Sequence, residues 1–181
     1  MHERRFHREI ERLRDPERIT RLEVERVVEL SLEGLLTPHA VLDIGTGSAI
    51  FAERFASRGL AVSGIDANPE MLTVAQGFVP EGVFKEAIAE AIPFNDHEFD
   101  LALMGLVLHE TDDPLKALQE AYRVTTDRVA VLEWRYEEGT FGPPLSDRIS
   151  GERIVSLAKQ AGFQTTQVIK LENLMLYRLD H

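Results

Sequence analysis

Short apolar runs alternate with longer segments of helical periodicity along most of the chain. Among the five earlier runs, the first, fourth and fifth are apolar almost throughout, which is typical of strands buried on both faces of a sheet. Two later runs, Phe163–Leu171 and Leu174–Leu179, predict a hairpin that turns at Glu172–Asn173. The five earlier strands are predicted at Ala40–Ile44, Leu60–Ile65, Gly82–Lys85, Phe99–Leu103 and Arg128–Trp134.

Capping residues mark where most of the predicted helices begin. A side chain that can accept a backbone N–H precedes each of these segments, and proline often follows at the first helical position. The segment Ser48–Ser57 is also predicted as a helix, which ends at Gly59. The periodicity that begins at Pro16 continues to Gly34, so most of the first forty residues are expected to be helical. The predicted capping residues are Asp15, Asn68, Asp113 and Ser150.

This order of elements predicts an α/β fold: a three-layer, doubly wound and mostly parallel sheet with a C-terminal antiparallel strand. The 181 residues fit one domain, residues 1–181, and we expect helices within residues 1–38 to cover the ligand cleft. Ligands bind such sheets at the carboxyl ends of the strands, near the point where the strand order reverses. Asp43, Asp66, Met104–Gly105 and Glu133–Arg135 are predicted at such ends.

Composition narrows the classes of function. The hydrophobic fraction of 44% and the charged fraction of 28% are those of an ordinary globular protein. No apolar run approaches the ~18 residues that cross a bilayer, and Met1–Arg14 lacks the apolar stretch of a secretory signal. The chain has no Cys, which removes disulfides, thiolate metal sites and a cysteine nucleophile. We therefore expect a cytoplasmic protein with no membrane partner.

The charge pattern argues against a nucleic-acid partner. The net charge is -11, whereas phosphate binding requires clustered Lys and Arg. The one basic-looking cluster is interleaved with glutamates, which favours a solvated helix with local ion pairs over an RNA-binding arm. We expect no metal site, because no His, Asp and Glu group has ligand spacing, and we expect a monomer or homodimer. The basic cluster consists of Arg4, Arg5, Arg8, Arg12 and Arg14.

A glycine turn after the first strand is the strongest functional signal. The sequence VLDIGTGSA spans residues 41–49, and a second carboxylate, Asp66, follows about twenty residues later, as in nucleotide-binding crossover units. The two glycines alone are equally compatible with a plain strand-to-helix turn. Ile50 stands where a dinucleotide fingerprint needs Gly or Ala, and the P-loop pattern is absent. Asp43 would repel a phosphate but attract a sulfonium or amino group, so a cationic adenosyl ligand is favoured.

At this point the chain resembles the class I S-adenosylmethionine-dependent methyltransferases, particularly the small domains of the ubiquinone/menaquinone-biosynthesis type. The resemblance covers roughly residues 41–163 and implies a Rossmann-like sheet. The motifs that carry it are VLDIGTGSA, GIDANPEMLTVA, EAIPFNDHEFDLALMGLVLHE, DPLKALQEAYRV, AVLEW and AGF.

The resemblance implies a set of binding residues for S-adenosylmethionine. Asp43 would bind the methionine amino group, and Asp66 would hold both ribose hydroxyls. The turn would lie against the methionine and ribose, while the residues after the second and third strands would flank the adenine. Two positions depart from the family pattern: Ala49 replaces the third glycine, and Ile88 replaces a frequent adenine-binding Asp. The implied binding set is Asp43, Gly45, Thr46, Gly47, Ser48, Asp66, Ala67, Met71, Ile88, Ala89, Met104 and Gly105.

The acceptor is expected to be a small molecule methylated at O, N or C. His109 is the candidate general base, because its unperturbed pKa lies near neutrality and it follows the fourth strand. The same residue is compatible with a purely structural role in its loop. Trp134 is a candidate wall for an apolar acceptor, and Tyr136–Ile149 is either a lid or a surface connection.

Two other functions stay open on the sequence. An NAD(P)-dependent oxidoreductase or epimerase would use Asp66 equally well, although Ile50 and the lack of a Tyr-x-x-x-Lys pair count against it. A non-catalytic accessory subunit that binds S-adenosylmethionine would explain Ile88 and the absence of a catalytic triad.

Overall fold

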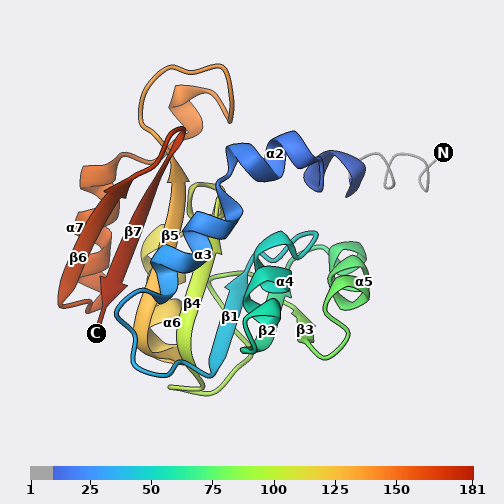
Figure 1. Ribbon diagram of the computed structural model, residues 1–181. Helices are drawn as coiled ribbons and strands as arrows, with labels where there is room; N and C mark the ends of the chain where they lie inside the picture. Colours follow the sequence, from blue (N-terminus) through green and yellow to red (C-terminus); the bar gives the residue numbers. More distant parts are fainter. Residues whose placement is uncertain (1–9) are drawn as a thin grey trace.

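The structure, a computed structural model, describes residues 10–181. Within these residues the strands form one seven-stranded sheet in the order β3-β2-β1-β4-β5-β7-β6 (Figure 1). The strands are β1 (Ala40–Ile44), β2 (Ala61–Asp66), β3 (Val83–Glu86), β4 (Phe99–Gly105), β5 (Thr125–Trp134), β6 (Thr165–Lys170) and β7 (Leu174–Asp180).

The pairing confirms the predicted fold class. β1 lies between β2 and β4 and pairs with both in parallel, and β3 and β5 extend the parallel sheet on either side. β7 is antiparallel to both β5 and β6, which gives the predicted terminal hairpin. The strand order reverses between β1 and β4, so the carboxyl ends of these two strands flank the expected ligand position.

The structure confirms the predicted capping residues at the starts of four helices. The side chains of Asp15, Asn68, Asp113 and Ser150 each accept a backbone N–H from the first turn of the helix that follows. The α-helices are α2 (Pro16–Arg21), α3 (Val24–Leu32), α4 (Ile50–Ser57), α5 (Pro69–Phe78), α6 (Pro114–Val124) and α7 (Gly151–Ala161), with 3-10 turns η1 (Leu108–Glu110) and η2 (Leu145–Asp147).

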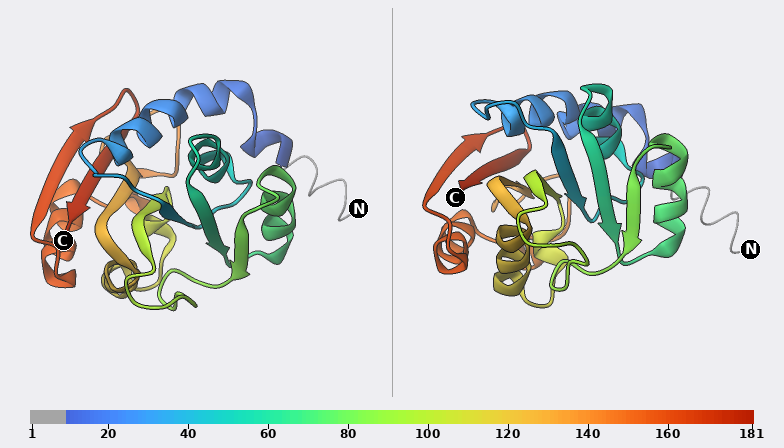
Figure 2. Two further views of the ribbon diagram at one scale, coloured as in Figure 1. Left: turned by 60° about the horizontal axis from the view of Figure 1, so that its bottom comes forward. Right: turned by 90° about the horizontal axis from the view of Figure 1, so that it is seen from below.

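Helices cover both faces of the sheet, as Figure 2 shows for α3 and α4 on one face and α6 and α7 on the other. Each face carries its own apolar core. Val41 faces α3 and α4, whereas its neighbour Leu42 faces α6 and α7, and both are fully buried. The strict alternation along a strand therefore accounts for the nearly continuous apolar sequence of β1, β4 and β5.

The N-terminal helical stretch is broken, contrary to the sequence expectation of continuous periodicity. It divides into α2 and α3 at Leu22 and Glu23, where Glu23 adopts a left-handed backbone (φ 50). Leu22 is buried at this break, and the Glu23 carboxylate accepts the backbone N–H of Glu172 at 2.7 Å. Tertiary contacts therefore hold a bend that helical periodicity does not encode. The prediction for Arg4, Arg5 and Arg8 lies outside the described residues.

Two buried arginines fix the end of α3 to the sheet. Nη1 of Arg128, on β5, donates to the carbonyl oxygens of Ser31 at 3.1 Å and Glu33 at 2.8 Å, while its Nε donates to Asp180 at 2.6 Å. Arg178, on β7, donates to the carbonyl oxygen of Leu30 at 2.9 Å. These carbonyls have no partner within the helix, so the two arginines satisfy them.

We expect Arg128→Met to lower the free energy of unfolding by roughly 2–3 kcal/mol, because it leaves buried carbonyls without donors. Arg26→Met is the matched control, since Arg26 is exposed and its one ion-pair partner within residues 10–181 is Glu23. Its loss should cost less than about 0.5 kcal/mol. Urea unfolding of both variants measures the difference, and equal losses would contradict the role given to Arg128.

Candidate functional site

The glycine turn joins β1 to α4 at the reversal point of the sheet. Gly45 and Gly47 both have positive φ, at 68° and 51°. A Cβ atom on Gly45 would lie 2.3 Å from Cγ2 of Val107, in the loop after β4. Glycine is therefore required at residue 45, because the loop packs directly against the turn backbone.

Asp66 holds the turn from the end of β2. Its Oδ2 accepts the backbone N–H of Gly47 at 2.8 Å, and its Oδ1 accepts that of Asn68 at 2.8 Å. The same carboxylate lies on the wall of a cavity at the carboxyl ends of the strands. One side chain thus both fixes the turn and faces the space above it.

Two adjoining cavities form the candidate site. The larger has a volume of about 500 Å³ and lies between the glycine turn, the end of β4 and residues 12–22. The smaller, about 250 Å³, lies between the ends of β2 and β3 and the loop after β4. Both are bordered by Gly45, Asp66, Val107 and Glu110, so they adjoin one another.

Most of the residues predicted to bind the adenosyl ligand come together here. The larger cavity is lined by Gly45, Thr46, Gly47, Ser48, Asp66, Met71, Gly105 and His109. The smaller cavity adds Ala67, Ile88 and Ala89. Met104 is fully buried in the core and is not on either wall, whereas Ile88 is 54% exposed. The contacts of all these residues with a ligand stay predictions.

Asp43 lies behind the turn, not on the cavity wall. It is 2% exposed, and its Oδ2 accepts the hydroxyl of Thr46 at 2.8 Å. Burial raises its pKa to about 7, with a further contribution from the charge of Asp66, although the hydrogen bonds from Thr46 and the Ala52 amide oppose the shift. The charge of Asp66 thus reaches Asp43 from the other side of the turn and disfavours a second negative charge there.

His109 and Glu133 form a buried pair at the cavity wall. Glu133, at the end of β5, is 1% exposed and accepts the Nδ1–H of His109 at 2.8 Å and its backbone N–H at 3.1 Å. Burial lowers the pKa of His109, but the hydrogen bond and charge of Glu133, together with Glu110, outweigh burial, so the net pKa is raised. The Nε2 atom is left as the nitrogen that can take a proton.

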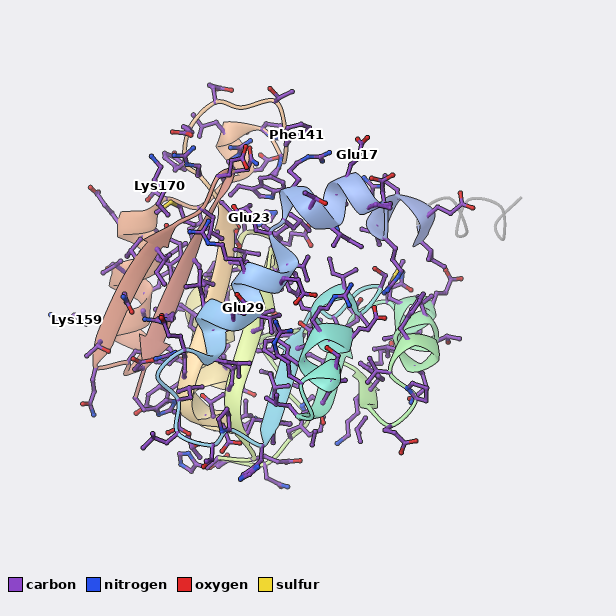
Figure 3. The ribbon with its side chains drawn as sticks, viewed as in Figure 1. Glu17, Glu23, Glu29, Phe141, Lys159 and Lys170 are labelled. Carbon is purple, nitrogen blue, oxygen red and sulfur yellow. The ribbon has the colours of Figure 1, made fainter. Side chains whose placement is uncertain are left out.

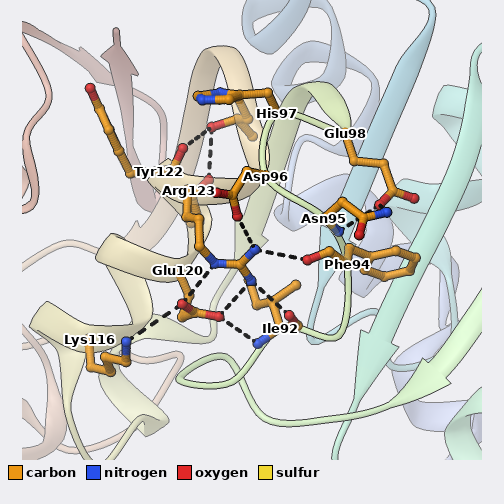
Figure 4. A network of polar contacts seen from close by, with 12 residues as sticks. Ile92, Phe94, Asn95, Asp96, His97, Glu98, Lys116, Glu120, Tyr122 and Arg123 are labelled. Carbon is orange, nitrogen blue, oxygen red and sulfur yellow. Dashed lines mark hydrogen bonds and ion pairs between the residues drawn. The ribbon is translucent and has the colours of Figure 1, made fainter.

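A charged network fixes the loop that follows β3 (Figure 4). Arg123, on α6, donates to the carbonyl oxygens of Ile92 and Phe94 at 2.9 Å each, and to Glu120 and Asp96. Glu120 accepts the backbone N–H of Ile92 at 3.0 Å. The network anchors this loop directly after Ala89, and so it supports one wall of the smaller cavity.

Several wall residues were missed by the sequence analysis. Arg12 was expected in a solvated helix with local ion pairs, but Arg12 and Arg18 line the larger cavity. Arg14 pairs with Glu53 on α4, far away in sequence, and donates to the carbonyl oxygen of Ser48. No local pattern marks these arginines as wall residues, since the bends around residues 14 and 22 decide which way they face.

Over residues 10–181, no three His, Cys, Asp or Glu side chains are grouped as a metal ion would require. Among the helices of this part of the chain, none combines the length and apolar character needed to span a membrane.

Comparison with known proteins finds similarity to methyltransferases. A family model described as a methyltransferase domain matches residues 42–131. A demethylmenaquinone methyltransferase of Renibacterium salmoninarum is 33% identical over 110 residues, 61% of this chain and 46% of that protein. A malonyl-[acyl-carrier protein] O-methyltransferase of Erwinia billingiae is 36% identical over 92 residues, 51% of this chain and 37% of that protein. The chain thus spans about half the length of such relatives or less.

Solved structures match over nearly the whole chain. A crystal structure of an S-adenosylmethionine-dependent methyltransferase from Aquifex aeolicus has a TM-score of 0.84 and 26% identity, and the match covers 95% of this chain and 96% of that chain. A possible histamine N-methyltransferase from Thermotoga maritima has a TM-score of 0.74 at 23% identity, over 97% of this chain and 96% of that chain, and shows the shared fold.

The raised pKa of Asp43 gives a stability prediction. Because its pKa is higher in the folded than in the unfolded protein, the native state binds more protons between about pH 4 and pH 7. The protonated Asp43 carboxyl therefore contributes to the free energy of unfolding at low pH, and this contribution is lost as the pH rises through 7. Asp43→Asn should therefore gain stability relative to the wild type by up to about 4 kcal/mol between pH 4 and pH 8. Urea unfolding at both pH values tests this, and a pH-independent difference would contradict it.

Proposed function

Because the chain belongs to the class I S-adenosylmethionine-dependent methyltransferases, we propose that it transfers a methyl group from S-adenosylmethionine to a small acceptor molecule. The observation that supports this most is one shared cavity wall. It combines the Asp66 carboxylate with the backbone of the Gly45–Ser48 turn at the reversal point of the sheet.

The two adjoining cavities suit the two halves of the adenosyl ligand. One side of the smaller cavity is apolar and suits an adenine ring, with Ala67, Ile88 and Ala89, while Glu90, Glu110 and Asp112 also line it. Asp66 lies where both cavities meet, and each carboxylate oxygen keeps a lone pair for a ribose hydroxyl. The larger cavity, bordered by Gly105 and the turn, would hold the methionine portion.

The carboxylates at the turn favour a cationic ligand, while Arg12 and Arg18 line the same cavity from the N-terminal segment. Asp66 is on the wall, and Asp43 lies directly behind the turn with a pKa raised to about 7. A positive ligand would stabilise both carboxylates, whereas a pyrophosphate would meet like charges at close range. This supports a sulfonium ligand over a dinucleotide. The bound donor supplies an activated methyl group, so the protein has mainly to align the acceptor.

The His109–Glu133 pair supports a role in proton removal from the acceptor. Glu133 fixes the ring through Nδ1 and holds the backbone of the same residue, so it orients His109 in one tautomer. Nε2 would then take a proton from an acceptor O–H or N–H as the methyl group is transferred. In this proposal His109 is the catalytic base and Glu133 is a positioning residue.

A small acceptor fits the space better than a macromolecule does. The two relatives are named for different acceptors, one a demethylmenaquinone and one a malonyl group on a carrier protein, so the relationship does not select between them. The acceptor space next to His109 is walled by Trp134 and Pro143, together with Leu22 from the N-terminal segment. These walls give the space beside His109 the dimensions of a small-molecule site.

We expect the protein to bind S-adenosylhomocysteine, the demethylated product, with micromolar affinity in isothermal titration. Asp66→Ala should weaken binding at least about tenfold, because it removes two charge-assisted hydrogen bonds. Glu86→Gln is the matched control, since Glu86 pairs directly with Asp66 across the strands but lies outside both cavities. A thermal melt checks that Asp66→Ala is folded. Equal heats for wild type and a folded Asp66→Ala protein would contradict the proposed ribose contact.

With an acceptor in hand, His109→Asn should lower kcat by roughly 100-fold and leave S-adenosylhomocysteine binding unchanged. The acidic limb of the wild-type pH–rate profile should lie above the ordinary pKa of histidine, because Glu133 raises the pKa of His109. Glu133→Gln removes that charge, so the limb should move to lower pH. A wild-type kcat in His109→Asn, or an unmoved limb in Glu133→Gln, would exclude the proposed base.

A further inference from the structure

A third cavity lies directly outside the candidate site. Its volume is about 560 Å³, and it shares Arg12, Arg18 and Trp134 with the larger site cavity, so the two adjoin one another. Arg21 and Phe141 line this outer cavity and neither of the two site cavities. We call it the outer chamber.

The outer chamber concentrates positive charge that the described chain leaves unpaired. Within residues 10–181, no ion pair is formed by Arg12, Arg18 or Arg21, in contrast to Arg14, Arg54 and Arg58 nearby. Nη1 of Arg18 donates only to the carbonyl oxygen of Leu13, at 3.1 Å. The lowered pKa of Arg18 has burial as its first cause, followed by the charges of Arg12 and Arg21.

Two carboxylates also line the chamber, but neither forms an ion pair with the three arginines. Asp15 is occupied as the cap of α2, where it accepts the backbone N–H groups of Glu17 and Arg18. Glu17 is exposed on the same helix. Three cations against two anions leave a net positive chamber in a protein whose overall charge is -11. Such a local excess attracts an anionic ligand.

Aromatic side chains complete the chamber. Phe141 lies beside α2, the helix that carries Glu17 (Figure 3), and the guanidinium of Arg21 lies 3.8 Å from its ring centre. Gly142 packs against Trp134 so closely that a Cβ atom would fall 2.6 Å from the indole. Arg148 holds this loop in place by donating to the carbonyl oxygens of Phe141 and Pro143.

We propose that the outer chamber binds the methyl acceptor through an oxyanion such as a carboxylate, with a flat apolar body of the acceptor against Trp134. Guanidinium groups pair with carboxylates in a bidentate way, and an indole face suits a planar ring. The acceptor would thus extend from the arginines past Trp134 to His109. This inference rests on the proposed function, of which it specifies the acceptor class.

The chamber can be tested without knowing the natural acceptor, because Trp134 is the single tryptophan of the chain. Its fluorescence would be titrated with 4-nitrobenzoate and with 4-nitrobenzamide, which has the same shape without the charge. Saturating S-adenosylhomocysteine would be present throughout. Because it occupies the donor site, the probe cannot bind at the place that holds the carboxylate of the donor. We expect the carboxylate probe to bind at least about tenfold more tightly than the amide.

Arg21→Gln is the decisive variant, since Arg21 lines the outer chamber and neither of the two site cavities, and Arg26→Gln on α3 is the matched control. Arg21→Gln should lose most of the preference for 4-nitrobenzoate and keep S-adenosylhomocysteine binding, while Arg26→Gln should behave as wild type. Equal or absent quenching by the two probes, or a preference that survives in Arg21→Gln, would overturn the inference. A failure of wild-type protein to bind S-adenosylhomocysteine, with the anion preference intact in its absence, would instead count against the proposed function.

Discussion

The hydrogen bond between the Gly47 amide and the Asp66 carboxylate joins the ends of β1 and β2, and the rest of the site is built around it. It fixes the glycine turn at the reversal point of the sheet, where Val107 packs against Gly45 from the other side. The turn in turn places the start of α4 over Asp43. Because Asp66 and Val107 fix the turn from two sides, its backbone is preorganised before any ligand arrives.

The site has opposite charges at its two ends. Asp66 and Asp43 make the inner end negative, which suits the sulfonium of a methyl donor, whereas Arg12, Arg18 and Arg21 make the outer chamber positive. His109 lies on the wall of the cavity between the two ends. A cationic donor and an anionic acceptor would therefore each be drawn to a different end, and this separation orients both substrates before the reaction.

The sequence predicted those features that local chemistry decides. Caps such as Asn68 and Asp113 satisfy backbone groups a few residues away, and the apolar runs of β1 and β4 follow from burial on both faces. Features that depend on distant contacts were missed or misjudged. The bend at Glu23 is held by Glu172, and Arg12 faces a cavity only because of the path of the chain after it. Asp43 points behind the turn because the Thr46 hydroxyl and the Ala52 amide of α4 donate hydrogen bonds to it there. This orientation does not follow from its place in the motif.

A crystal structure of the protein grown with S-adenosylhomocysteine tests the central claim most directly. The account predicts ligand density above the Gly45–Ser48 turn, with both ribose hydroxyls within hydrogen-bond distance of Asp66 and the adenine between Ala67 and Ala89. Density for the ligand at any other place, or a ribose that makes no contact with Asp66, would contradict it.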